Sequence, residues 1–385
     1  MRFIEPVRPR RARGLVADVY AEVRRDFALL RDPEGNSPWL AQSPDPEILA
    51  GFWSAFYETV VAEGSVERAD KELIAAAVSL GNDCPFCVDA HSFLCRVAGE
   101  SGAARALSEG RIAGIDDLGK RALAAWATAT REPGSNTAQR LPFGTREAPE
   151  IIGTALAFHY ANRIVEVFQG HRGLNFGPAP LRRMTIPSVA VVARRAMRRR
   201  HEPGRALSSL PEAELPEDLE WARAAPTVAT AWASFARAVE HGGSAVLSPP
   251  ERGFVISVLE DWDGRGQPVH SGSIEQALRA VSPRSRPAVR LALLAAFAPD
   301  QVDEDIVEHF RRTCPGDREL VRAVSWAALR AVRRIAAILT QGGGRYAAGP
   351  ASAPGMTATQ ASSSAKPASA ERMAASAFQA RGKPA

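Results

Sequence analysis

Four side chains at a regular spacing form a candidate redox centre: Glu72, Cys84, Cys87 and His91. Cys87 and His91 are four residues apart, so they share a face of the helix that is predicted to begin at Cys84. At a helix start, free N–H groups and the helix dipole favour an anion, which is expected to lower the pKa of the Cys84 thiol. Glu72 lies on the preceding predicted helix, which must turn back at residues 81–83 and can place a carboxylate beside that face. A thiol, a base and a group that orients the base together predict an activated nucleophile.

Three other interpretations of the CxxC pair remain open from the residues alone. A zinc site would need a fourth ligand, and Cys95 lies eight residues after Cys87, ~12 Å along a helix, too far to join the same ion. The two cysteines could instead be buried and inert. A thioredoxin-like motif would need a strand before the helix, whereas the residues before Cys84 read as helix. We therefore expect no metal and no bound cofactor.

Apolar residues recur at spacings of three and four, and alternating runs are scarce, so the sequence predicts an all-α fold. Asp45-Pro46 and the Gly81-Asn82 pair supply start and stop signals for the first two helices of the candidate site. The predicted helices are 48–60, 67–80, 84–99, 118–130 and 149–169.

An internal repeat indicates that one helical unit occurs twice. Four residues recur 179 positions later, and two further segments recur after 169, so ten residues are missing between His91 and Arg121. The four pairs are Trp53 and Trp232, Phe56 and Phe235, Glu72 and Glu251, and His91 and His270. Asp263 and Gly266 occupy the positions of the two cysteines and cannot do thiol chemistry. The second copy is expected to replace a second subunit, and a cysteine-free acid/base site at Glu251 and His270 is the alternative.

The composition shifts along the chain predict five parts. These are a flexible basic N-terminal arm (1–20), a domain with the CxxC site (21–175), a linker (176–220), a degenerate repeat (221–341) and a disordered tail (342–385) rich in Ala, Ser, Gly and Pro.

The composition also narrows the class of protein. The net charge of +5 does not by itself indicate a nucleic-acid partner, and no apolar run of about 18 residues predicts a membrane span. Four cysteines and the lack of a signal-peptide pattern favour a cytoplasmic protein. The arginine cluster 194–200 is interpreted as a solvated linker helix, with nucleic-acid or anionic-membrane contact as the alternative. Cys95 and His159 are expected in the core, and Cys314 in a loop.

The pattern Glu-x11-Cys-x2-Cys-x3-His resembles the signature of the alkylhydroperoxidase D and carboxymuconolactone decarboxylase family. The segment Phe158-His-Tyr-Ala-Asn-Arg163 also resembles a helix of a peroxidase-related branch. The resemblance covers residues 45–170 well and 225–340 weakly. It implies a helical bundle, here as two tandem copies, that assembles into homo-oligomers; a duplicated chain could form a trimer where single-copy relatives form hexamers. One departure is Phe86, where some members have histidine.

The resemblance also implies a thiol peroxidase or disulfide reductase. Glu72 and His91 would take a proton from Cys87, which would attack a hydroperoxide and become a sulfenic acid. Cys84 would supply a proton and then close the Cys84–Cys87 disulfide, and a lipoyl-type dithiol or thioredoxin-like reductant would reopen it. Two alternatives are a lyase of the carboxymuconolactone decarboxylase type and a redox sensor or scaffold that is not an enzyme.

Overall fold

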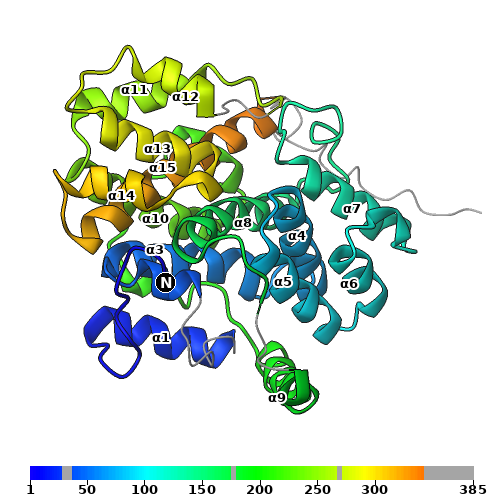
Figure 1. The fold of residues 1–385 in the computed structure, drawn as a ribbon. Coiled ribbons are helices and arrows are strands. Elements are labelled where there is room, and N and C mark those ends of the chain that lie inside the picture. Colours follow the sequence, from blue (N-terminus) through cyan, green and yellow to red (C-terminus); the bar gives the residue numbers. More distant parts are fainter. Residues whose placement is uncertain (28–36, 175–178, 267–270, 342–385) are drawn as a thin grey trace, which may run out of the picture. The chain divides into compact units, whose positions relative to one another are not determined.

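The computed structural model describes residues 1–27, 37–174, 179–266 and 271–341. Within these ranges the chain forms helices and no strand, which confirms the expected all-α fold (Figure 1). None of the described helices is both long enough and apolar enough to cross a lipid bilayer. The predicted tail, 342–385, lies outside the described residues.

The helices that carry the candidate site form where the sequence signals place them. In α3 (Pro46–Phe56), Asp45 caps the first turn by accepting hydrogen bonds from two backbone N–H groups, and Pro46 occupies the first position. One π-helical turn (Tyr57–Val61) continues α3. The next helices are α4 (Arg68–Gly81), α5 (Pro85–Val97), α6 (Ser101–Ser108), α7 (Leu118–Ala129) and α8 (Ala148–Gln169).

A tight turn joins α4 to α5 and sets the position of the first cysteine. Asp83 has a φ of 54°, in the left-handed region, and the N–H of Cys84 donates to the carbonyl of Ser79 over 3.0 Å. Gly81 allows α4 to end against α7, because a Cβ there would lie 2.5 Å from the carbonyl oxygen of Thr128. The turn therefore brings α5 back alongside α4, as the spacing predicts.

The second half repeats the helix order of the first. The helices α10 (Pro226–Ser244), α11 (Pro249–Glu260), α12 (Ser271–Leu278), α13 (Arg286–Phe297) and α15 (Asp317–Thr340) follow in the order of α3, α4, α5, α7 and α8. In the described ranges, α6 has no counterpart between α12 and α13, where the repeat predicts missing residues. The short helix α14 (Glu304–Arg311) has no counterpart in the first half.

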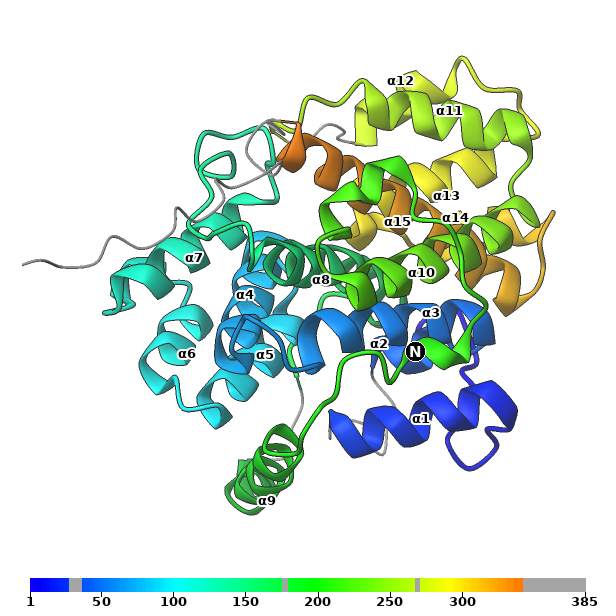
Figure 2. The ribbon, with the colours of Figure 1, turned by 180° about the vertical axis from the view of Figure 1, so that it is seen from behind.

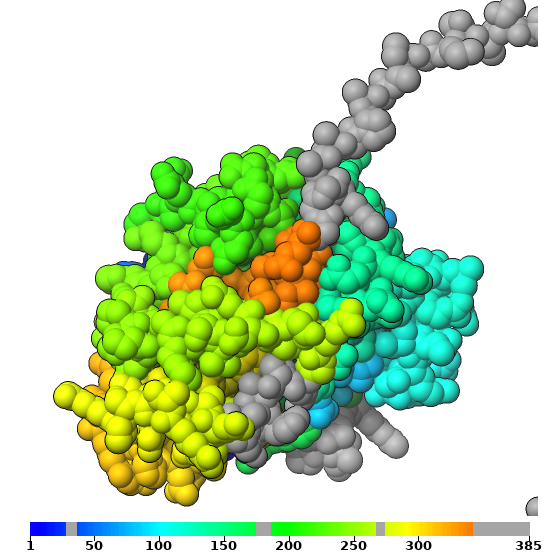
Figure 3. Space-filling view, turned by 90° about the horizontal axis from the view of Figure 1, so that it is seen from above, coloured from blue at the N-terminus to red at the C-terminus, as the bar shows by residue number. Residues whose placement is uncertain are grey.

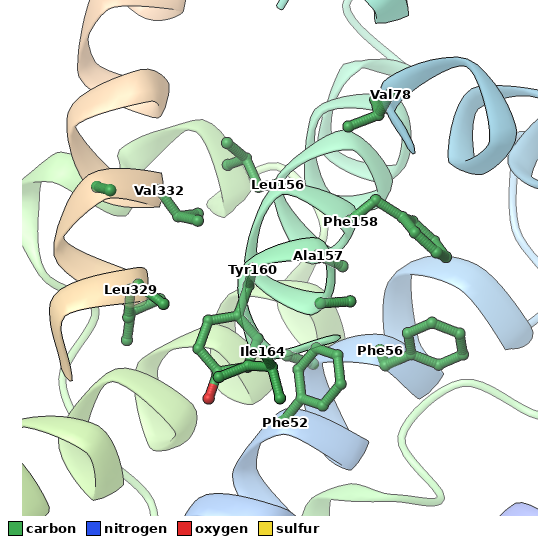
Figure 4. Packing of buried hydrophobic residues seen from close by; sticks show 14 of the residues in the cluster. Phe52, Phe56, Val78, Leu156, Ala157, Phe158, Tyr160, Ile164, Leu329 and Val332 are labelled. Atoms are coloured by element: carbon green, nitrogen blue, oxygen red, sulfur yellow. The ribbon is translucent and has the colours of Figure 1, made fainter. Parts of the chain in front are cut away.

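Corresponding helices of the two halves pack against each other: α3 against α10, and α8 against α15 (Figure 2). Such self-pairing is the pattern of a two-fold interface between identical subunits. At its centre, the ring of Phe52 lies 4.8 Å from Tyr160 and 5.8 Å from Phe235, between ring centroids. Figure 4 shows α8 between Phe52 of α3 and the Leu329 and Val332 side chains of α15. The second half thus covers α3 and α8 of the first half.

The N-terminal segment, expected to be a flexible arm, is packed onto this core. The N–H of Arg2 donates to the carbonyl of Phe168 over 2.7 Å, and Ile4 is buried. Helix α1 (Gly14–Asp26) buries Val16 and Tyr20 and packs on α3. The boundaries of the two predicted domains stay a prediction.

Two predicted features of the linker and the second copy can be located. Helix α9 (Ala179–Met197) lies within the predicted linker, and most of the 194–200 arginine cluster is exposed around its end. Glu251 closes a capping box at the start of α11, where it accepts from the N–H of Ser248 over 2.7 Å. Its observed role is therefore to cap a helix, and His270 lies outside the described residues.

The stretch that replaces the CxxC pair in the second copy contacts the first copy. The N–H of Gly134 donates to the carbonyl of Gly264 over 2.9 Å, and Arg265 Nε donates back to the carbonyl of Gly134 over 3.1 Å. Nearby, the Gln139 side chain donates to the carbonyl of Ile338 over 3.2 Å. In Figure 3 the end of α15, in orange, lies between segments of the two halves.

We expect Gly51→Val to lower the free energy of unfolding by about 1–3 kcal/mol, because overpacking forces helices apart. A Cβ at Gly51 would lie 3.0 Å from the Cα of Phe235, at the contact of α3 with α10. Gly253→Ala is the control: it is helical, exposed and has no atom within 4 Å of an added Cβ. This control should raise the free energy of unfolding by roughly 0.5–1 kcal/mol. Urea unfolding measures both, and equal effects would contradict the close approach.

Candidate dithiol site

Glu72 is a buried carboxylate held from two sides. It is 0% exposed on α4; its Oε1 accepts from Arg68 Nε over 2.7 Å and its Oε2 lies 2.6 Å from His91 Nδ1. Burial alone would raise the pKa of Glu72, but the charges and hydrogen bonds of Arg68 and His91 outweigh it and lower that pKa. Glu72 is therefore ionised at neutral pH despite its burial.

His91 is oriented by this carboxylate and by aromatic rings. Because Glu72 engages Nδ1, the opposite nitrogen, Nε2, is the one left for proton exchange. The imidazole stands edge-on to Phe158, with 4.3 Å between centroids, and lies 6.0 Å from Phe27. The ring therefore has a fixed position in the wall of a cavity that it shares with Cys87.

Cys84 and Cys87 are both reduced, and their thiols are hydrogen-bonded to each other. Cys84 is 0% exposed and Cys87 is 4% exposed, with Val165 and Phe86 packed against the pair. Burial raises the pKa of Cys84 well above its ordinary value, and Cys87 and Glu166 raise it further. The expected lowering of the Cys84 pKa at the helix start is thus wrong, because desolvation outweighs the helix dipole.

Cys87 opens onto a small apolar cavity of about 60 Å³. Its described lining comes from the start of the chain, α2 (Pro38–Gln42), α3, α5 and α8. The aromatic side chains in the lining are Phe27, Trp39, Phe52, Phe56, Phe86 and Phe158. Figure 4 shows Phe56 and Phe158 on adjacent helices of this region. The cavity can take a small group with an apolar substituent and bring it to the sulfur of Cys87.

The structure thus brings Glu72, Cys84, Cys87 and His91 into one region, with Glu72 and His91 in direct contact and the two thiols in direct contact. Helix α4 precedes the CxxC pair, so the thioredoxin-like interpretation is wrong. Among the described residues, no group of three His, Cys, Asp or Glu side chains is arranged to hold a metal ion.

Cys95, His159 and Cys314, the other residues considered in the sequence, lie outside the dithiol site. Cys95 is 0% exposed in the core, as expected, and burial raises its pKa to about 12. His159 is also buried as expected, with Nε2 2.8 Å from Thr130 Oγ1 and Nδ1 3.1 Å from the Asn82 amide. Burial and two nearby arginines lower the pKa of His159 well below its ordinary value, so it stays neutral. Cys314 lies in the loop between α14 and α15.

Two residues of the site were missed in the sequence. Arg68 could have been found, because it lies four residues before Glu72 on the same predicted helix. Glu166 gave no such signal: it lies 82 positions after Cys84 in the sequence, yet its side chain contacts the Cys84 thiol.

Comparison with known proteins identifies the family. The profile of the carboxymuconolactone decarboxylase family matches residues 48–130, which include all four predicted site residues. A Mycobacterium tuberculosis protein named alkyl hydroperoxide reductase is 38% identical over 333 residues, which are 86% of this chain and 93% of the relative. The chain belongs to the alkylhydroperoxidase D-like/carboxymuconolactone decarboxylase family. An alignment of 333 residues extends through both halves, so this relative matches the second half as well.

We expect Glu72→Gln to lower the free energy of unfolding at pH 7 by about 2–3 kcal/mol, since it removes charged hydrogen bonds. The pKa of Glu72 in the folded protein lies below its ordinary value of 4.5. Its stabilisation is therefore complete above about pH 4.5 and is lost as the pH falls through the lowered pKa. Urea unfolding at pH 7 and at pH 3.5 should show the difference between variant and wild type shrinking in acid. A difference that does not depend on pH would contradict an ionised Glu72.

Proposed function

We propose that this protein is a thiol-dependent peroxidase and disulfide reductase of the alkylhydroperoxidase type. The observation that carries the proposal is the asymmetry of the dithiol: Cys87 faces an apolar cavity beside a histidine oriented by an ionised glutamate, while Cys84 is buried behind it. The name of the Mycobacterium tuberculosis relative supports the same reaction class.

The reaction begins when Glu72 and His91 take the proton of Cys87. The thiolate attacks the outer oxygen of a hydroperoxide in the cavity, the O–O bond breaks, and Cys87 becomes a sulfenic acid. The departing alkoxide takes the proton of the Cys84 thiol. Because burial raises the pKa of Cys84, this thiol is still protonated when the alkoxide forms. Cys84 then attacks Cys87, forms the disulfide and expels hydroxide, which leaves as water with the proton held by His91.

A dithiol of the lipoyl type, or a thioredoxin-like protein, then reduces the disulfide and restores the two thiols. Because such reductants act in the cytoplasm, we propose the same location for this enzyme. The apolar cavity favours a hydroperoxide with a hydrocarbon substituent over a charged one. Glu251 in the second copy serves a helix cap, so we assign that half a structural role.

Purified protein is expected to consume tert-butyl hydroperoxide over many turnovers with dihydrolipoamide as reductant. Cys87→Ser and Cys84→Ser should both reduce turnover to background, and Glu72→Gln should reduce it by about 100-fold, because proton transfer contributes that much. Cys95→Ala is the matched control, since Cys95 packs in the core outside the dithiol pair, and its turnover should stay within about twofold. A single oxidation without turnover would indicate a redox sensor instead, and no reaction would refute the proposal.

We also propose that the chain forms a homo-oligomer of fewer subunits than single-copy relatives, with three as the expected number. The second half already covers the face at which corresponding helices pair. Sedimentation equilibrium at micromolar concentration should give a mass near three times 41.2 kDa. A stable monomer would contradict this assembly.

A further inference from the structure

A second cavity is lined by Glu166, whose side chain lies beside the Cys84 thiol. It has a volume of about 500 Å³ and is bordered by both halves of the chain. Its lining is mostly polar and includes Arg131, Arg163, Glu166, His171, Trp262 and Asp300. None of these residues belongs to the aromatic pocket around Cys87. Cys87 thus lines an apolar cavity, and Glu166, the neighbour of Cys84, lines a separate polar one.

Glu166 lies between this cavity and Cys84. The carboxyl group is only 2% exposed, and it lies beside the Cys84 thiol. Its other polar neighbour is His171 Nδ1, 3.4 Å from Oε2. Neither oxygen has a protein hydrogen bond of good geometry within the described part of the chain. A buried carboxyl group with so few partners is energetically unfavourable in its charged form. It is therefore suited to exchange a proton.

The reductive half of the proposed cycle needs a group of this kind. Cys84 is completely buried, whereas Cys87 reaches the aromatic pocket, so a reductant has access to Cys87 alone. Attack on Cys87 makes Cys84 the leaving group. Thiol exchange is slow when the leaving thiol has a high pKa, and burial gives Cys84 a strongly raised one. A proton donor beside Cys84 would remove this obstacle.

We infer that Glu166 is the general acid that protonates Cys84 when a dithiol reduces the Cys84–Cys87 disulfide. This inference rests on the proposed function and assigns a further catalytic residue to the same site. Burial raises the pKa of Glu166 despite its contacts with Cys84 and His171, which favours the protonated form required of an acid.

The step balances as follows. A thiolate of the reductant attacks Cys87 Sγ, the S–S bond breaks, and Cys84 leaves with the electron pair and takes the proton of Glu166. The second thiol of the reductant, as a thiolate, attacks its own sulfur in the mixed disulfide and releases Cys87. The reductant leaves as a disulfide, and Glu166 regains a proton from solvent in the polar cavity. Glu72 and His91 serve Cys87, and Glu166 serves Cys84.

The test separates the two half-reactions in wild type, Glu166→Gln, Glu166→Asp and Gln301→Ala. Each protein is oxidised with one equivalent of tert-butyl hydroperoxide, then mixed rapidly with dihydrolipoamide, and free thiols are counted by alkylation and mass spectrometry. Glu166→Gln should be oxidised within about twofold of the wild-type rate but reduced at least about 100-fold more slowly. Glu166→Asp, which keeps the acid, should recover part of that loss.

Gln301→Ala is the matched control, because Gln301 lines the same cavity and has no charge that would act on Glu166 or Cys84. Its reduction should stay within about twofold of wild type. Reduction of Glu166→Gln at the wild-type rate would overturn the inference, as would equal slowing of both half-reactions or equal slowing in Gln301→Ala. If peroxide does not oxidise wild type, the proposed function fails; the role of Glu166 is then measured on protein oxidised with diamide.

Discussion

The ionisation of one fully buried carboxylate organises the site. Glu72 has no contact with solvent, and its charge persists because Arg68 and His91 bind one oxygen each. The same contacts fix the histidine tautomer and set the spacing between α4 and α5. The tight turn at Asp83 and the glycine contact with α7 are the backbone conditions that let these helices meet. The proposed thiol chemistry thus depends on an electrostatic arrangement made mainly within two adjacent helices.

The two cysteines differ because their surroundings differ. Cys87 has aromatic walls and a base, whereas Cys84 has a carboxyl group that lines a polar cavity. A dithiol that must act first as nucleophile and then as leaving group needs different proton partners at its two sulfurs. In the proposed cycle, Glu72 and His91 serve Cys87, and Glu166 serves Cys84.

The sequence predicted what depends on short spacings. The helices around Cys84, the grouping of the four candidate residues and the repeated helix order all follow from periodicity, capping residues and fixed offsets. The sequence did not predict the role of Glu166, because its contact with Cys84 depends on how α8 packs and no local pattern encodes that packing. The Cys84 pKa was mispredicted for a related reason: the helix dipole is visible in the sequence, but the degree of burial that opposes it is not. The order of residues 1–20 was missed likewise, since contacts such as Arg2 with Phe168 join distant segments.

Helix α3 pairs with α10, and α8 with α15, within one polypeptide. This affects how the two halves can evolve and whether their contact depends on protein concentration. In a homodimer every substitution appears twice, so neither site can lose its thiols without the other losing them too. Covalent linkage removes that constraint, and the stretch around Gly264, which carries no cysteine, contacts the loop at Gly134. Linkage also makes this contact independent of how many molecules are present. The internal pairing therefore persists in a cell that makes very little of the protein.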